Sequence, residues 1–230
     1  MIDFAENSLY FGLVLTLLSY SFGTYLKKKT RFSLCNPILI SIIVCILVLS
    51  IFKIDYNVYY SGAKYISYLL TPATICLAIP LYEQFSLLKK NWIAILTGIV
   101  SGVITSLCTI LSMCYILSMS HEDYVSLLPK SITTAIGMDV SAELGGYVSI
   151  TVAVIIITGI LGNVFGELVL KFFKIREPIA KGIAMGTSSH AIGTSKALEF
   201  GEVEGAMSSL SIVISGILTV VGASIFAKFF

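Results

Sequence analysis

The stretch AIGMDVSAELG at residues 135–145 returns in altered form as AIGTSKALEFG at residues 191–201. The alignment superposes the two Ala-Ile-Gly triplets, one glutamate and one closing glycine. After an offset of one residue, IIITGILG at 155–162 lies over IVISGILT at 212–219. Each copy is a hydrophobic segment broken by polar and glycine residues, followed by an uninterrupted apolar run. We interpret the pair as an internal repeat.

The composition around this repeat is that of an all-α integral membrane protein. Of 230 residues, 57% are hydrophobic and only 12% are charged, and the mean hydropathy is +0.94. A water-soluble domain of this size needs a charged surface that this chain lacks, and its apolar residues form long runs. We expect about six full spans, at roughly 8–26, 35–53, 62–82, 92–117, 147–172 and 203–228. Two broken segments, at 125–145 and 180–201, lie between them.

The basic residues predict how these segments lie in the membrane. Ten of the fifteen fall in three short loops, which the positive-inside rule places in the cytoplasm. The loops hold Lys27, Lys28, Lys29 and Arg31, then Lys89 and Lys90, then Lys171, Lys174, Arg176 and Lys181. All three stay inside if segment 125–145 enters and leaves on the outer side, or crosses twice.

Segment 180–201 has two possible arrangements. If it crosses fully, the C-terminus is inside, and if it is re-entrant from the cytoplasm, the C-terminus is outside. The repeat favours the re-entrant arrangement. Two re-entrant segments would then form an inverted-topology repeat, a layout typical of secondary transporters. We expect a single membrane domain over residues 1–230, with N-terminal spans at 1–60, a helix pair at 61–120 and repeat units at 121–172 and 178–230.

Polar side chains crowd the two broken segments. Backbone that is not helical inside a membrane must be buried in protein or line a wet cavity. Where a half-helix begins at such a break, its free amides suit an anion. The candidate substrate-binding residues are Lys130, Ser131, Thr133, Thr134, Ser188, Ser189, His190, Gly193 and Thr194. For each hydroxyl the alternative is helix packing, where small residues are common.

Ionisable residues in these segments are candidates for coupling or gating, because a charge inside the membrane is costly unless it is paired or hydrated. Lys130 would contact a carboxylate or extend to the outer surface. His190 would couple transport to protons, or be a structural histidine bonded to a backbone carbonyl. Asp139 and Glu143, four residues apart on one helical face, would pair with Lys130, bind a cation or face the outer water. Glu202 and Glu204 would form a gate or a helix-start charge pattern.

Enzyme signatures are missing from the sequence. GxSxG, HExxH, a P-loop and a dinucleotide fingerprint do not occur. Ser189 and His190 are neighbours in sequence and would not face each other in a helix. We therefore expect no enzymatic activity, no metal and no cofactor.

Several stretches resemble the LrgB/CidB family. They are LLTPATICLAIPLYEQ (69–84), LLPKSITTAIGMDVSAELGG (127–146), GIAMGTSSHAIGTSKALEFGEVEGAMSSL (182–210) and SGILT (215–219), with SHAIGT (189–194) the most specific. The resemblance implies a multi-pass protein of the bacterial cytoplasmic membrane that acts with a small holin-like partner of the LrgA/CidA type. The resemblance further implies a relation to bacterial pyruvate uptake systems and to the plastid glycolate/glycerate translocator.

Two functions follow from these features. The first, whose cargo the family resemblance implies, is a transporter or facilitator for small monocarboxylates such as pyruvate or glycolate, and it accounts for the polar groups within the broken segments. The alternative is an antiholin-like regulator of murein hydrolase export and cell lysis, which the family resemblance implies. The expected partners are the lipid bilayer, the LrgA/CidA-like protein and a small carboxylate anion. Homo-oligomerisation is left open, and no nucleic acid is expected.

Overall fold

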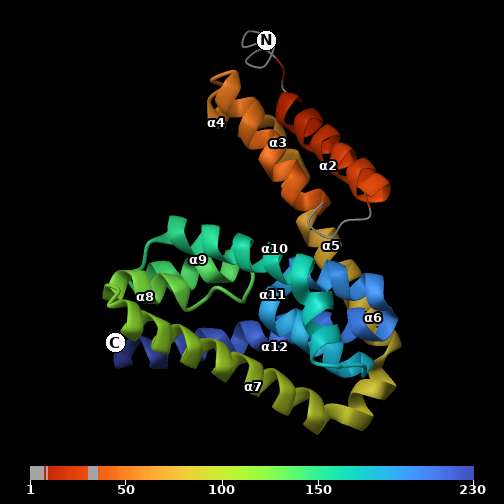
Figure 1. Cartoon of the computed structure of the whole chain (residues 1–230), viewed down its shortest axis with the longest axis vertical. Coiled ribbons are helices and arrows are strands. Elements are labelled where there is room, and N and C mark those ends of the chain that lie inside the picture. Colours follow the sequence, from red (N-terminus) through yellow and green to blue (C-terminus); the bar gives the residue numbers. More distant parts are fainter. Residues whose placement is uncertain (1–7, 9, 31–35) are drawn as a thin grey trace. The chain divides into compact units, whose positions relative to one another are not determined.

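In the computed structural model, which describes residues 8, 10–30 and 36–230, every regular element is a helix (Figure 1). This confirms the predicted all-α class. The helices are α2 (Phe11–Thr30), α3 (Pro37–Ile51), α4 (Tyr56–Ser67), α5 (Leu70–Cys76), α6 (Ala78–Glu83), α7 (Phe85–Leu117), α8 (His121–Leu127), α9 (Thr134–Glu143), α10 (Val148–Phe172), α11 (Pro178–Phe200), α12 (Glu202–Phe226) and the 3-10 turn η1 (Ala227–Phe229). Arg31, the last member of the first basic cluster, lies outside the described residues.

Four helices of the described part of the chain are long and apolar enough to cross a membrane. The first is the stretch Tyr56–Glu83, which takes α4, α5 and α6 together, and the others are Phe85–Leu117, Val148–Phe172 and Glu202–Phe229. They match four of the six predicted spans. The other two predicted spans correspond to α2, with 20 residues, and to the shorter apolar helix α3, with 15. The exact number of spans stays a prediction.

The chain divides into two compact units, residues 1–76 and residues 77–230. In the first unit, α2 packs against α3 and α4. The hydroxyls of Thr16 and Tyr59 lie 2.8 Å apart between α2 and α4, and Gly23 lets α2 approach the backbone of Pro37. Asn36 starts α3 by accepting hydrogen bonds from the amides of Ile38 and Leu39. The assignment of one membrane domain to the whole chain stays a prediction.

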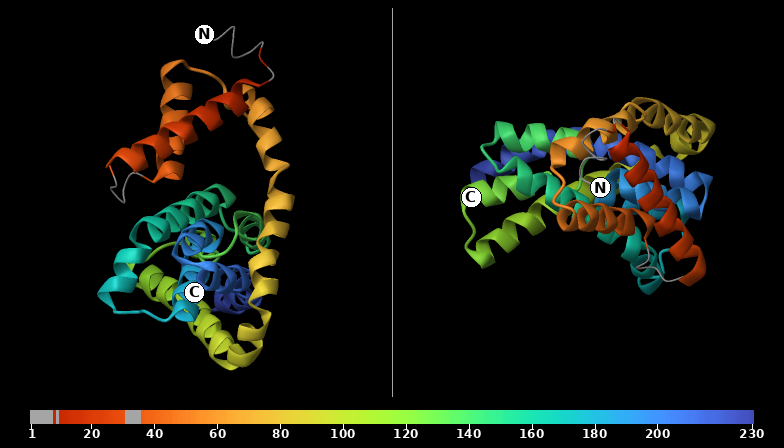
Figure 2. Two further views of the ribbon diagram at one scale, coloured as in Figure 1. Left: turned by 90° about the vertical axis from the view of Figure 1, so that its right-hand side faces the viewer. Right: turned by 90° about the horizontal axis from the view of Figure 1, so that it is seen from above.

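The second unit is a bundle of α7, α10, α11 and α12 with the short helices α6, α8 and α9 packed on it (Figure 2). Its core joins one face of α7 to α12. Ile95, Ile99 and Leu107 on α7 are almost fully buried in the same cluster as Met207 and Ala223 on α12. Burying aliphatic side chains at three- and four-residue spacing holds the two long helices together.

The first broken segment folds back on itself. α8 ends at Leu127 and α9 begins at Thr134, with non-helical backbone between them. The Thr151 hydroxyl on α10 contacts both arms, because its oxygen lies 2.9 Å from the Ser126 carbonyl oxygen and 2.7 Å from the Ser141 hydroxyl. α8 and α9 therefore reach the same end of α10, and the break predicted within 125–145 is present.

The second broken segment also folds back. α11 is interrupted at Ser189 (φ −138°, ψ 17°) and His190 (φ 42°, ψ −137°). A Cβ atom on Gly193 would lie 2.5 Å from the Met185 carbonyl oxygen. In a straight helix, eight residues span about 12 Å. The arms before and after the break, here called α11a (178–188) and α11b (191–200), therefore lie against each other.

Contacts with α12 give the direction of each arm. On α11a, Gly182 packs on Glu204 and Gly186 on Ser208, so this arm runs parallel to α12. On α11b, Thr194 bonds to Ser208 and Leu198 packs on Gly205, so this arm runs antiparallel to α12. Both ends of α11 consequently lie beside the start of α12, and the break predicted within 180–201 is present.

Candidate functional site

A cavity of about 830 Å³ lies between α7, the first break and α11a. Polar and small side chains make up much of its wall. It is lined by Asn91, Ala94, Gly98, Ser101, Gly102, Thr105, Ser106, Thr109, Lys130, Ser131, Glu177, Ile179, Ala180, Ile183, Ala184, Thr187 and Ser188. Its volume is within the range of small-molecule pockets, so the space is ample for a three-carbon carboxylate.

Lys130 is the cationic side chain in this lining. Its ammonium donates a hydrogen bond to the Ser131 hydroxyl at 3.2 Å, and that hydroxyl lies 3.2 Å from the Ser106 hydroxyl on α7. Within the described part of the chain, no carboxylate lies within 4.0 Å of the Lys130 ammonium. The site therefore presents a positive charge and adjacent hydroxyls, with no counter-ion among the residues that the structure describes.

The α7 side of the cavity was not anticipated from the sequence. Ser101, Thr105 and Thr109 recur at four-residue spacing and so share one helical face. Gly98 and Gly102 flank this face and let α11a approach, with Ile183 3.4 Å and Thr187 3.2 Å from the positions that their Cβ atoms would take. The hydroxyl spacing was visible in the sequence, but nothing there indicated which helix it would face.

The other end of the cavity lies where α7 and α11 begin. Asn91 departs from helical geometry (φ −114°, ψ 18°), and its side-chain amide donates to the Leu87 carbonyl at 3.0 Å. Glu177 is the N-cap residue of α11. Asn91 precedes Ser106 by 15 residues, which corresponds to about 22 Å of helix. The cavity thus runs along α7 from a carboxylate at one end to an ammonium at the other.

Three of the predicted substrate-binding residues line this cavity: Lys130, Ser131 and Ser188. Ser188 also donates to the Ala184 carbonyl at 2.7 Å. Thr133 is the N-cap residue of α9 and Thr134 its first residue, and both are half-buried outside the cavity lining. Of the predicted binding residues, the structure thus places only Lys130, Ser131 and Ser188 in one cavity.

The remaining predicted binding residues lie in the contacts of the second break with α10 and α12. Ser189 packs against Gly162, and the His190 ring lies 3.0 Å from the Ile155 carbonyl oxygen. Thr194 bonds to the His190 carbonyl at 3.0 Å and to the Ser208 hydroxyl at 2.7 Å. Gly193 lies where the two arms of α11 meet. These contacts are of the packing type that the sequence allowed as an alternative.

The predicted coupling and gating carboxylates occupy different surroundings. Asp139 and Glu143 are exposed on α9, and Glu202 is exposed at the start of α12. Glu204 is only 6% exposed, and its carboxylate lies 3.4 Å from the Lys181 ammonium on α11a. The suggested pairing of Asp139 or Glu143 with Lys130 is wrong, since neither is within 4.0 Å of its ammonium.

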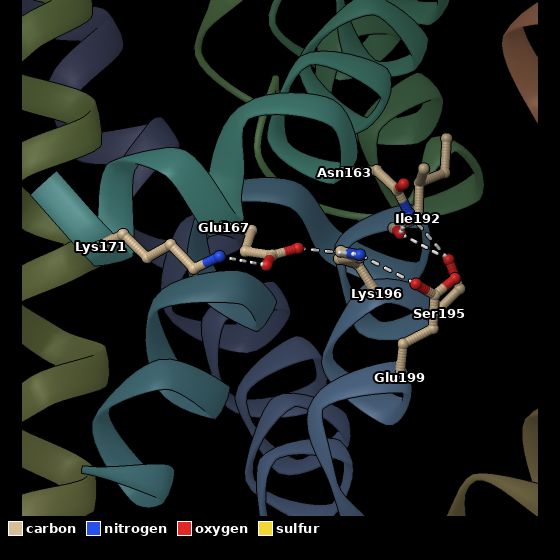
Figure 3. A network of polar contacts seen from close by, with 7 residues as sticks. All are labelled: Asn163, Glu167, Lys171, Ile192, Ser195, Lys196 and Glu199. Atoms are coloured by element: carbon tan, nitrogen blue, oxygen red, sulfur yellow. Dashed lines mark hydrogen bonds and ion pairs between the residues drawn. The ribbon is translucent and has the colours of Figure 1, made fainter. Parts of the chain in front are cut away.

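A polar network fastens α11b to α10 (Figure 3). The Lys196 ammonium lies 3.2 Å from the Glu167 carboxylate and 2.9 Å from that of Glu199, and Lys171 also binds Glu167 at 2.8 Å. One turn along α10, the Asn163 amide donates to the Ile192 carbonyl at 2.7 Å. This network was not anticipated, although a lone asparagine in an apolar span is a visible signal.

The sequence of the chain is similar to a known protein family. Residues 16–229 match the model of the LrgB-like family. Proteins named "Antiholin-like protein LrgB" from Bacillus cereus (strain B4264) and Bacillus anthracis (strain A0248) are each 38% identical over 221 residues, which cover 96% of this chain and 96% of theirs. No solved structure matches the chain.

Proposed function

The chain belongs to the LrgB-like family, and from that premise we propose that it transports small monocarboxylates, such as pyruvate or glycolate, or facilitates their passage. The observation that carries the proposal is the Lys130 ammonium, which has no carboxylate within 4.0 Å in the described residues and contacts the cavity hydroxyl of Ser131. Because an unpaired cation inside a membrane is costly, a carboxylate is the group that this site lacks.

The hydroxyls of the cavity suit the rest of such a substrate. Ser101, Thr105 and Ser188 extend from the region of Lys130 along the wall. Each hydroxyl both donates and accepts, so it fits the oxo or hydroxy group next to a carboxylate. A charged contact at one end and adaptable polar contacts beside it favour a short polar anion over an apolar ligand.

We propose further that the two broken segments are re-entrant hairpins that enter from opposite sides of the membrane, as an inverted-topology repeat. Both reach Ile155 on α10: Gly137 of the first packs on the Ile155 side chain, and His190 of the second lies against its carbonyl oxygen. Hairpin tips that meet on one helix support a site opened alternately to each side. The bacterial cytoplasmic membrane and a small partner of the LrgA/CidA type are parts of the same proposal.

Uptake of labelled pyruvate and glycolate into vesicles that contain the full chain, with and without the partner, tests the function. We expect saturable uptake that falls in Lys130→Met and persists in Lys90→Met, which removes an exposed charge at the start of α7. The absence of saturable uptake of either anion, with the partner present, would overturn the transport proposal.

The second candidate is regulation of cell lysis, which the printed name of the relatives, antiholin-like, favours. Cells that express the chain with its partner would be scored for lysis, comparing wild type with Lys130→Met. Under the transport proposal the substitution alters any lysis phenotype together with uptake. A phenotype that persists unchanged when uptake is abolished would favour the regulatory role.

A further inference from the structure

A second concavity, of about 330 Å³, lies at the turn between α10 and α11. It is separate from the cavity that holds Lys130, because the two share no lining residue. Its wall contains four basic side chains, one carboxylate and three apolar side chains. They are Lys171, Lys174, Arg176, Lys181, Glu167, Leu170, Ile175 and Phe200.

The charges of this wall are only partly compensated. Lys171 binds Glu167 at 2.8 Å, and Lys181 lies 3.4 Å from Glu204. In the part of the chain that the structure describes, Lys174 and Arg176 have no carboxylate within 4.0 Å. Two cations therefore remain for a ligand, and both are exposed where the turn meets solvent.

The guanidinium of Arg176 narrows the ligand class. Its planar set of donors matches two oxygens of a phosphate, and a lysine such as Lys174 adds a point charge to the same group. Because Lys174 and Arg176 lie in one short turn, a single phosphate between them would satisfy both. A basic pocket between membrane helices at the membrane surface is suited to a lipid head group.

The surroundings of the pocket favour a lipid over a soluble phosphate. Leu170, which is 6% exposed, gives the wall an apolar part together with Ile175 and Phe200. Beside the pocket, Leu168 and Phe172 of α10 and Phe173 leave their side chains exposed. Aromatic side chains at the end of a span are typical of the membrane interface, so acyl chains would have apolar surface next to the head group.

From these contacts we infer that the concavity binds the phosphate of an anionic phospholipid from the leaflet that faces the α10–α11 turn. Lys174 and Arg176 hold the phosphate, Lys171 and Lys181 add to the positive potential, and the exposed apolar side chains of α10 receive the acyl chains. This binding site is independent of carboxylate transport, and its test does not use transport.

The experiment titrates the purified full chain in detergent with phosphatidylglycerol and counts bound lipids by native mass spectrometry. The test variant is Lys174→Gln with Arg176→Gln. The matched control is Lys89→Gln with Lys90→Gln, which removes two exposed charges near the start of α7. We expect the apparent affinity of the first lipid to fall about tenfold in the test variant, and to be unchanged in the control. Phosphatidylcholine, which carries no net charge, should bind more weakly than phosphatidylglycerol.

Two results would overturn the inference. The first is an equal loss of phosphatidylglycerol affinity in both double variants, or no loss in either, since the effect would then not depend on the pocket. The second is displacement of the lipid by inorganic phosphate or glycerophosphoglycerol at comparable concentration, which would identify a soluble phosphate as the ligand. Thermal unfolding of each variant checks that its fold is intact.

Discussion

The Nε2 atom of His190 lies 3.0 Å from the backbone carbonyl oxygen of Ile155 and joins the tip of the second hairpin to α10. A carbonyl oxygen only accepts hydrogen bonds, so Nε2 carries the proton in this contact. The His190 backbone, at φ 42° and ψ −137°, is in a region that non-glycine residues rarely adopt. The buried hydrogen bond offsets this strain and explains how a histidine is held there.

The opposing effects of strain and hydrogen bonding predict how two variants rank. His190→Ala loses the hydrogen bond and keeps the strain, at a cost of about 1–3 kcal/mol. His190→Gly loses the bond but relieves the strain, so it should be more stable than His190→Ala by about 1 kcal/mol. Thermal unfolding in detergent measures both variants.

The control for this ranking is His121→Ala, which removes an exposed imidazole that lies 3.0 Å from the Phe230 carbonyl. Water can take the place of the exposed imidazole as a hydrogen-bond partner, so the free energy of unfolding of the control should fall by well under about 1 kcal/mol. A glycine variant less stable than the alanine variant would contradict the assignment of strain to His190.

The proton-coupling role predicted for His190 is tested by the pH dependence of uptake. If this imidazole exchanges the coupled proton, uptake by His190→Gln should lose the part of its pH dependence that falls between about pH 5 and 8. Glutamine keeps a donor for the Ile155 carbonyl, which separates coupling from the structural contact. Initial rates of uptake across that range are the measurement, and an unchanged pH profile would leave His190 as a positioning residue.

The breaks themselves could be predicted from the sequence, because Gly, Ser, Thr and Pro interrupt otherwise apolar runs at 125–145 and 180–201. The arrangement of the site could not. Which side of a break faces a cavity depends on tertiary contacts, and these turn Ser188 toward α7 while Ser189, the next residue, packs on Gly162 of α10. The contribution of α7 was missed for the same reason, since Thr105 and Ser101 gain significance only when α11a packs beside them.

The proposed contact between Lys130 and the substrate carboxylate predicts how substitutions of this residue change substrate affinity. Lys130→Met keeps an unbranched apolar chain and removes the charge, so the apparent affinity for pyruvate or glycolate should fall about tenfold or more. Lys130→Arg should retain part of the affinity because it keeps the charge. Concentration dependence of uptake gives these values, with Lys90→Met as the exposed control. An affinity unaltered in Lys130→Met would exclude an anion contact at this residue.

The close contact between the two arms of α11 predicts that Gly193→Ala destabilises the protein. A Cβ atom there would lie 2.5 Å from the Met185 carbonyl oxygen, so Gly193→Ala must push α11b away from α11a. Such overpacking costs about 1–3 kcal/mol. Gly98→Ala is the matched control, because its Cβ atom would meet Ile183 at an ordinary 3.4 Å. Thermal unfolding compares them, and equal stability of the two variants would show that the arms are not in contact.

The opposed entry of the two hairpins predicts where single cysteines can be labelled. In a background in which all five cysteines are replaced, a membrane-impermeant maleimide should reach Asp139→Cys or Glu143→Cys from the outer side. It should reach Lys174→Cys from the cytoplasmic side only. Lys174 is chosen over Lys196 of α11b as the labelling position, because the Lys196 side chain is only 16% exposed and is paired with Glu167 and Glu199. If the two hairpins entered from one side, both sets of cysteines would react from the same side, and the inverted repeat would be excluded. Labelling of intact cells before and after permeabilisation separates these outcomes, because only a cytoplasmic cysteine gains reactivity when the membrane is opened.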